Sequence, residues 1–278
     1  MPGQGSVAET FQASPGAGSV SLFQPVVVVA GSRRQEITTR NDKGMELTVD
    51  DQRVLHTSAG DFPLNEYRLR LAGREWSILY ADSVLTREDE NHFLGELKGR
   101  LPYGVALWPA SIALAHDIVS RADDLRGRRV LELGAGTGLP GIVAASLGAR
   151  VVQTDRDELA MSACRRNGAR NRVEAVEHRM ADWTCWEDAD KYDWIIGSDI
   201  LYGVELQPHL RRIFESNLEP GGRVLLSDPF RAVSLGLLEA MEADGWSVTL
   251  SKWSVGEEAS PRPVAVFELA APGLNPST

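Results

Sequence analysis

The chain has 278 residues, of which 43% are hydrophobic and 24% charged, and its formal net charge is −10. This length allows one large domain, or one domain with an extension, around an ordinary hydrophobic core. The acidic balance provides no global electrostatic attraction for nucleic acid, so a nucleic-acid partner is not expected.

Targeting and redox features predict a soluble cytoplasmic protein without a metal centre. The longest apolar run near the start, Val26 to Ala30, is far shorter than the roughly 20 residues of a membrane span. It also lacks the basic lead of a signal peptide. The two cysteines, Cys164 and Cys185, lie in unlike contexts and lack the spacing of metal ligands. We expect reduced thiols, no metal site and no membrane association.

The N-terminal part is predicted to be a tail followed by a small β element. Residues 1–44 are rich in Gly, Ser, Ala, Gln and Thr, which favours a disordered tail, with a short strand allowed at "PVVVV". Met45 is an alternative start. Around Ala72-Gly73, "YRLRLAGREWSILY" alternates apolar and polar residues, which predicts a β-hairpin. Residues 45–100 are expected to form this hairpin and a helical lead-in.

From residue 101 to 270, strand and helix patterns alternate as in βαβ units. Helical periodicity covers 112–125, 140–147, 157–167, 205–218 and 234–243. Strands are predicted at 128–134, 149–155, 174–180, 192–199, 221–228, 246–252 and 263–270. The pattern predicts one α/β domain with a seven-stranded, mostly parallel sheet flanked by helices, and a tail at 271–278.

A glycine turn follows the first strand of this domain and leads into a helix. Gly134, Gly136 and Gly138 allow positive φ and close approach of a ligand to backbone N–H groups. The dinucleotide fingerprint G-x-G-x-x-G needs a glycine where Leu139 stands, which counts against a dinucleotide. Glu132 is a poor neighbour for a pyrophosphate and a good one for a ligand ammonium group. The spacing therefore favours a cofactor that carries an amino acid.

The next strand ends at Asp155, 19 residues after Gly136, where a carboxylate can accept both hydroxyls of a ribose. Together, "LELGAGTG" and "QTD" resemble the first motif and the ribose position of class I S-adenosylmethionine-dependent methyltransferases. This resemblance implies a Rossmann-like fold and S-adenosyl-L-methionine as cofactor. It implies that the turn, with Gly134, Ala135, Gly136 and Gly138, binds the methionine portion, and that Asp155 binds the ribose.

The stretch "MADWTCW" follows the third strand, where the resemblance places an adenine. Asp182 is expected to accept the adenine amino group, and Trp183 to lie against the base. Trp186 is interpreted as a core or interface aromatic. A purely structural role for both tryptophans is the alternative.

The fourth strand ends in "GSDILYGVE" and lacks the Asn/Asp-Pro-Pro-aromatic motif that grips a planar nitrogen. Instead, Asp199 to Tyr202 resembles the acidic-x-x-aromatic motif of the family 16 protein methyltransferases, which include many protein-lysine methyltransferases. "LWPAS" resembles the tryptophan-containing lead-in of that family. The resemblance covers roughly residues 100–270 and implies cofactor contacts for Trp108 and Ser198, and an acceptor pocket shaped by Asp199 and Tyr202. The similar "SDPF" at 227–230 is interpreted as a loop at the rim.

The resemblance implies a methyltransferase that modifies a lysine side chain of a protein. Asp199 would orient the incoming ammonium, while desolvation and the sulfonium would lower its pKa. A metabolite or, less expected, RNA is the alternative acceptor, and a non-catalytic module that binds cofactor or partner is a third hypothesis. No histidine has a persuasive catalytic place.

Overall fold

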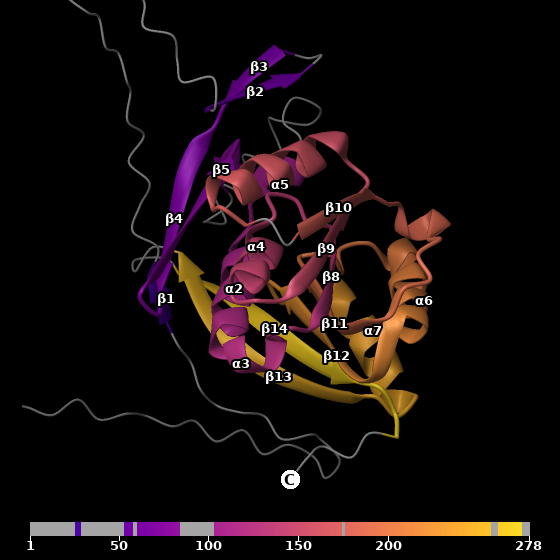
Figure 1. Cartoon of the computed structure of the whole chain (residues 1–278). Helices are drawn as coiled ribbons and strands as arrows, with labels where there is room; N and C mark the ends of the chain where they lie inside the picture. The colour runs from indigo at the N-terminus through magenta and orange to yellow at the C-terminus, as the bar shows by residue number, and fades with distance from the viewer. Residues whose placement is uncertain are drawn as a thin grey trace, which may run out of the picture.

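The computed structural model describes residues 26–28, 53–57, 60–83, 103–173, 176–256 and 261–273. A mixed sheet runs through the main domain (Figure 1). Its strands are β1 (Val26–Val28), β8 (Arg129–Leu133), β9 (Arg150–Asp155), β10 (Val176–Met180), β11 (Tyr192–Ser198), β12 (Leu218–Asp228), β13 (Ser247–Gly256) and β14 (Arg262–Ala270). Strands β8 to β14 confirm the predicted seven-stranded, mostly parallel, Rossmann-like sheet.

The spatial order of the strands is β1-β13-β14-β12-β11-β8-β9-β10. Strand β14 is antiparallel to its neighbours β12 and β13, whereas the other neighbouring pairs of this sheet are parallel. The chain runs outward from β8 to β9 and β10, then returns to the other side of β8 with β11. This reversal between β8 and β11 is the place where open α/β sheets bind ligands, beyond the carboxyl ends of the strands.

Strand β1 adds an eighth strand at the outer edge. Val26 to Val28 pair in parallel with Ser254 to Gly256 of β13. This is the "PVVVV" segment at which a short strand was allowed. The other residues of the predicted tail, 1–25 and 29–44, lie outside the described residues, as do residues 84–100 of the segment 45–100 for which a hairpin and a helical lead-in were predicted.

Helices cover both faces of the sheet, and the predicted helical segments are confirmed with shifted bounds. They are α2 (Pro109–Ser120), α3 (Ala122–Leu125), α4 (Leu139–Ser146), α5 (Glu158–Arg170), α6 (Gln207–Asn217) and α7 (Ala232–Ala243), with short 3-10 turns η2 (Tyr103–Val105), η3 (Trp183–Cys185) and η4 (Val204–Leu206). The predicted helix over 112–125 divides at Arg121, whose φ of −109° ends α2. No described helix is long and apolar enough to cross a membrane.

Two hydrophobic clusters lie on opposite faces of the sheet because successive strand residues point in opposite directions. In β8, Val130 belongs to the same cluster as Ile142 of α4, whereas Leu131 belongs to the cluster that contains Phe214 of α6. Helices α2, α4 and α5 therefore lie on one side and α6 and α7 on the other (Figure 1).

The predicted hairpin is confirmed as β4 (Asn65–Leu71) and β5 (Arg74–Tyr80), with both turn residues, Ala72 and Gly73, at positive φ. A second hairpin, β2 (Val54–Thr57) with β3 (Gly60–Pro63), was not predicted, because neither short strand alternates clearly. Two residue pairs also join β6 (Asp82–Ser83) to β7 (Ala106–Leu107).

Two asparagines form hydrogen bonds with the edge of β5 that does not pair with β4: Asn167 within α5, and Asn171 directly after its C-terminal end. Asn167 accepts a hydrogen bond from the Leu79 N–H at 2.8 Å and donates one to the Leu79 carbonyl at 3.0 Å. Asn171 does the same at Ser77, with distances of 2.8 and 2.7 Å. Four helical residues rise about 6 Å, close to the ~6.7 Å of two strand residues. The helix therefore presents side-chain amides at the spacing of a neighbouring strand.

Replacing Asn167 by alanine is expected to lower the free energy of unfolding by about 2–4 kcal/mol, since it leaves buried backbone groups of Leu79 without partners. Asn167 also donates to the Thr137 carbonyl at 2.9 Å, so the loss extends to the glycine turn. Urea unfolding measures the change. The control is Asn65→Ala at an exposed position, expected to change stability by less than about 0.5 kcal/mol. Equal effects of the two substitutions would contradict the bridging role.

Candidate active site

A cavity of about 690 Å³ opens at the carboxyl ends of the parallel strands. All but two of the predicted site residues line it: Trp108, Gly134, Ala135, Gly136, Asp155, Asp182, Trp183, Ser198, Asp199 and Tyr202. They come from five segments that are far apart in the chain. The exceptions, Glu132 and Gly138, lie behind the glycine turn.

The glycine turn forms a tight cradle. Gly134, Gly136 and Gly138 have φ values of 64°, 56° and 82°, in the left-handed region that favours glycine. A Cβ atom on Gly134 would lie 3.0 Å from Ile200 and 3.2 Å from the Trp183 ring. A Cβ on Gly136 would lie 3.2 Å from the Gly104 carbonyl. The turn is therefore closed to larger residues by conformation and by space.

Asp155 connects this turn to the cavity. One carboxylate oxygen accepts from the Gly136 N–H at 3.0 Å, and the other accepts from the Asp157 N–H at 2.9 Å. Burial raises the pKa of Asp155 above its usual value, although these two hydrogen bonds oppose the rise. Its oxygens retain acceptor capacity toward the cavity, because a carboxylate accepts about four hydrogen bonds.

Glu132 faces the interior and not the cavity. It is 1% exposed, accepts from the Gly141 N–H at 3.2 Å and lies 2.6 Å from the Gln153 amide nitrogen. Burial raises the pKa of Glu132 to about 8. Glu132 is not part of the cavity lining and fixes the start of α4 behind the turn, and its contact with a ligand ammonium stays a prediction. The alternation of β8 turns Glu132 inward, and no cationic side chain of the described residues pairs with it there.

Gly138 also acts through packing. It is the N-terminal boundary residue of α4, and a Cβ there would lie 3.0 Å from Gln153 and 3.1 Å from Cys164. The spacing of the glycines predicted the turn correctly, but not which glycines face the cavity.

The segment after β10 brings two predicted residues to the cavity. Asp182 accepts from the N–H and the hydroxyl of Thr184, at 2.8 and 2.7 Å, and these bonds lower its pKa. Asp182 thereby caps η3, which carries Trp183 over Gly134. Trp186 lies elsewhere: its indole donates to Asn217 at 2.9 Å and packs on the core, as interpreted from sequence.

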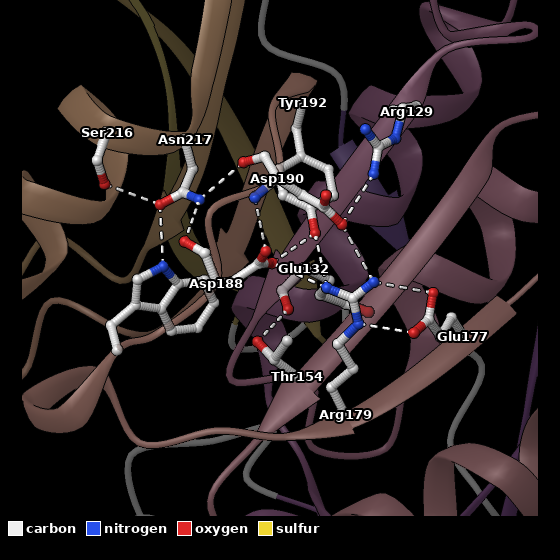
Figure 2. A network of polar contacts seen from close by, with 11 residues as sticks. Arg129, Glu132, Thr154, Glu177, Arg179, Asp188, Asp190, Tyr192, Ser216 and Asn217 are labelled. Atoms are coloured by element: carbon white, nitrogen blue, oxygen red, sulfur yellow. Dashed lines mark hydrogen bonds and ion pairs between the residues drawn. The ribbon is translucent and has the colours of Figure 1, made fainter.

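A polar network holds the rest of this segment in place (Figure 2). Arg179 of β10 pairs with Asp188 and Asp190 at 3.1 and 3.2 Å, and the Tyr192 hydroxyl donates to Asp188 at 2.6 Å. The Asn217 amide donates to the carbonyls of Asp188 and Asp190. The return from β10 to β11 is therefore fixed at both ends, and η3 with Trp183 lies between them.

The part of the cavity beyond β11 and β12 contains an ion pair. Asp199 follows β11 with a φ of 57°, and its side chain is only 8% exposed. The guanidinium of Arg231 pairs with this carboxylate and also lines the cavity. Tyr202 is half exposed, and partial burial raises the pKa of its hydroxyl.

Arg231 was missed by the sequence reasoning. It directly follows the "SDPF" stretch, which was interpreted only as a rim loop. The available signal was the repeated Ser-Asp at 198–199 and 227–228, since two carboxylates at adjacent strand ends favour a nearby cation.

Comparison with known proteins assigns the chain to a family. A family model described as lysine methyltransferase matches residues 88–233. The protein N-lysine methyltransferase METTL21A of Danio rerio is 34% identical over 180 residues, which are 62% of this chain and 71% of that protein. The METTL21A of Xenopus tropicalis is 37% identical over 159 residues, covering 55% and 74%. The chain belongs to the lysine methyltransferase family and is a methyltransferase of that family.

A solved structure with a similar fold supports the architecture. The 16S rRNA N2 G1207 methyltransferase RsmC of T. thermophilus, in complex with AdoMet and guanosine, aligns with a TM-score of 0.51 and 20% identity. The alignment covers 75% of this chain and 50% of RsmC. At this identity the likeness concerns the fold alone.

Glu132→Gln is expected to remove a pH dependence of stability. The native pKa of Glu132 is about 8, against 4.5 for an ordinary glutamate, so between these values the unfolded state binds fewer protons and stability falls as pH rises. The loss amounts to at most about 1.4 kcal/mol per pH unit. Urea unfolding at several pH values from about 5 to 8 should show the variant gaining on the wild type as pH rises. Glu215→Gln, at an exposed position, is the control; parallel curves for Glu132→Gln and wild type would refute a neutral Glu132.

Proposed function

We propose that this chain transfers the methyl group of S-adenosylmethionine to a lysine side chain of a protein. This proposal depends on one observation: the glycine turn, Asp155 and Asp199 all line the same cavity. The METTL21A relatives, named protein N-lysine methyltransferases, support the same acceptor. The residues of the cavity therefore divide into a cofactor part and an acceptor part.

The cofactor part suits S-adenosylmethionine. Gly134 and Gly136 have positive φ and carry no side chain, so their backbone N–H groups can approach a ligand closely. Asp155 would accept the ribose hydroxyls, and Trp183 and Trp108 would contact the adenosine and close the cavity. When bound, the cofactor supplies a methyl group on a positively charged sulfur. Glu132 and Gly138 would support this part from behind.

The acceptor part has to take a lysine side chain and exclude water from it. Asp199 is the buried carboxylate that would accept hydrogen bonds from the lysine nitrogen. Tyr202 and Ile200 would form the walls of its channel. Alignment of the nucleophile with the methyl group is the main contribution asked of such a site.

Exposed apolar side chains that follow the carboxyl ends of the strands support a polypeptide acceptor over a metabolite. Among the described residues, the exposed large hydrophobic side chains are Met180, Tyr202, Val204, Phe230 and Leu235. All lie at or beyond the carboxyl ends of β10, β11 or β12. A hydrogen bond of 2.8 Å from Gln207 to the Val233 carbonyl brings the start of α6 to the start of α7. Exposed apolar side chains at this end of the sheet would provide contacts for a polypeptide. The cytoplasmic location stays a prediction.

Transfer of radiolabelled methyl into a cell lysate tests the proposal. Purified wild type should produce label that protease releases and RNase does not, and hydrolysis should yield methyl-lysine. Asp199→Ala should lower the rate by about 100-fold or more, because the acceptor nitrogen loses its orienting partner. Calorimetry should give the same cofactor affinity for this variant as for the wild type.

The control is Asp244→Asn on the surface, which should retain full activity. Label that passes a small-cutoff filter would indicate a metabolite acceptor. Cofactor binding without transfer to any fraction would instead indicate a non-catalytic module.

A further inference from the structure

Two aspartates and one arginine meet at the acceptor end of the cavity. The register pairs Ser198 of β11 with Ser227 of β12, which brings the following residues, Asp199 and Asp228, to adjacent strand ends. Arg231 pairs with the Asp199 carboxylate through both of its terminal nitrogens, and one of these lies 3.8 Å from Asp228. The guanidinium therefore lies between two carboxylates that would otherwise repel each other.

The backbone around this cluster is unusual and well fixed. Asp199 and Phe230 have φ values of 57° and 61°, although neither is a glycine. Such conformations cost energy and persist where the surroundings hold them. The Asp199 N–H donates to the Ser227 carbonyl at 2.8 Å, and the Arg231 N–H donates to Asp228 at 2.7 Å. The backbone at Asp199 and Phe230 is thus held so that the side chains of Asp199 and Arg231 meet.

Asp228 serves as the inner anchor of the cluster. Its side chain is fully buried and accepts from the Ser234 hydroxyl at 2.6 Å as well as from the Arg231 backbone. Burial raises the pKa of this carboxyl. Asp228 holds the Arg231 backbone in place, while the guanidinium reaches the cavity at 26% exposure.

An isolated Asp199 would hinder methylation of a lysine. An opposite charge within about 4–6 Å stabilises the ammonium form and raises its pKa. The ammonium ordinarily has a pKa of about 10.4 and has no lone pair for attack. A site for this reaction therefore needs a carboxylate that orients the nitrogen without retaining its proton. An adjacent cation satisfies both requirements.

We infer that Arg231 is a positioning residue that neutralises Asp199, so that the acceptor pocket takes lysine as its neutral amine. This inference rests on the proposed function for its acceptor. The lysine nitrogen loses a proton to water while Asp199, still paired with Arg231, accepts one of its N–H groups. The lone pair of the nitrogen then forms the N–C bond, and the electron pair of the broken C–S bond remains on sulfur. Arg231 itself touches neither reacting atom.

The first test uses a simple cation and needs neither methyl donor nor protein acceptor. Butylammonium chloride is titrated into the full chain at neutral pH, and binding is followed by NMR. Arg231→Gln should bind it about tenfold more tightly than wild type, because Asp199 is no longer neutralised. Arg231→Lys keeps the charge and should stay near wild type. The double variant with Asp199→Asn should lose the gain, and Arg126→Gln on the surface should change nothing.

The second test is the pH profile of methyl transfer to the lysate protein that wild type labels. Arg231→Gln should shift the rising limb upward by about 1 pH unit or more, since the acceptor pKa rises. Arg231→Lys should keep the wild-type limb even if its rate is lower. Both variants leave the other ionisable groups that face the cavity and this cluster unchanged. These groups are Asp155, Arg156, Asp157, Asp182, Asp199, Tyr202, Glu205 and Asp228.

The two tests separate this inference from the proposed function. Folded Arg231→Gln that binds butylammonium no more tightly than wild type overturns the inference, whatever the enzyme methylates. Coincident pH limbs for wild type and both variants do the same, because a purely structural Arg231 would lower the rate without moving the limb. If Arg231→Gln does not fold, a limb displaced in Arg231→Lys overturns the inference equally. Wild type that labels no protein overturns the proposed function, and the inference about its acceptor with it.

Discussion

The left-handed turn between β8 and α4 is the constraint on which the rest of the site depends. Its three glycines adopt φ values that other residues adopt only under strain, and Asp155 holds the middle one through its N–H. Behind the turn, buried Glu132 binds the first turn of α4. Asn167 bonds to the carbonyl of Thr137 in the same turn and to β5 of the hairpin. The N-terminal hairpin is thereby part of the support of the cavity.

Burial gives the acidic groups of the site different tasks. Glu132 is fully enclosed and pairs with no cation among the described residues, so its neutral form is favoured and it acts as a structural hydrogen-bonding group. Asp155 and Asp228 are stabilised by backbone N–H groups that oppose the effect of burial. Asp199 has a different partner, the guanidinium of Arg231. This pair lines the cavity, so Asp199 would meet a ligand with its charge already compensated.

Sequence periodicity predicted the sheet and the cavity more fully than it predicted side-chain directions. Strand alternation and the glycine spacing located β8, the turn and Asp155, because each depends on neighbours in the chain. The inward direction of Glu132 depends on how β8 lies between two helical layers, which its own residues do not specify. The second hairpin has strands too short for a pattern, and the bonds of Asn167 to Leu79 join segments 88 residues apart. Arg231 was not predicted for the same reason, because its partner Asp199 lies 32 residues earlier in the chain.

The position of β14 in the sheet leaves the two carboxylates of Asp199 and Asp228 at adjacent strand ends. Because β14 enters the sheet on the far side of β12, β11 and β12 remain parallel neighbours whose Ser-Asp ends lie in register. The parallel register places Asp199 beside Asp228. The short connection from β12 to α7 then brings the guanidinium of Arg231 close to both carboxylates. The same strand ends lead into the exposed Val204 and Phe230. Charge compensation and apolar surface thus arise together at one edge, where a lysine and the protein that carries it would arrive as a unit.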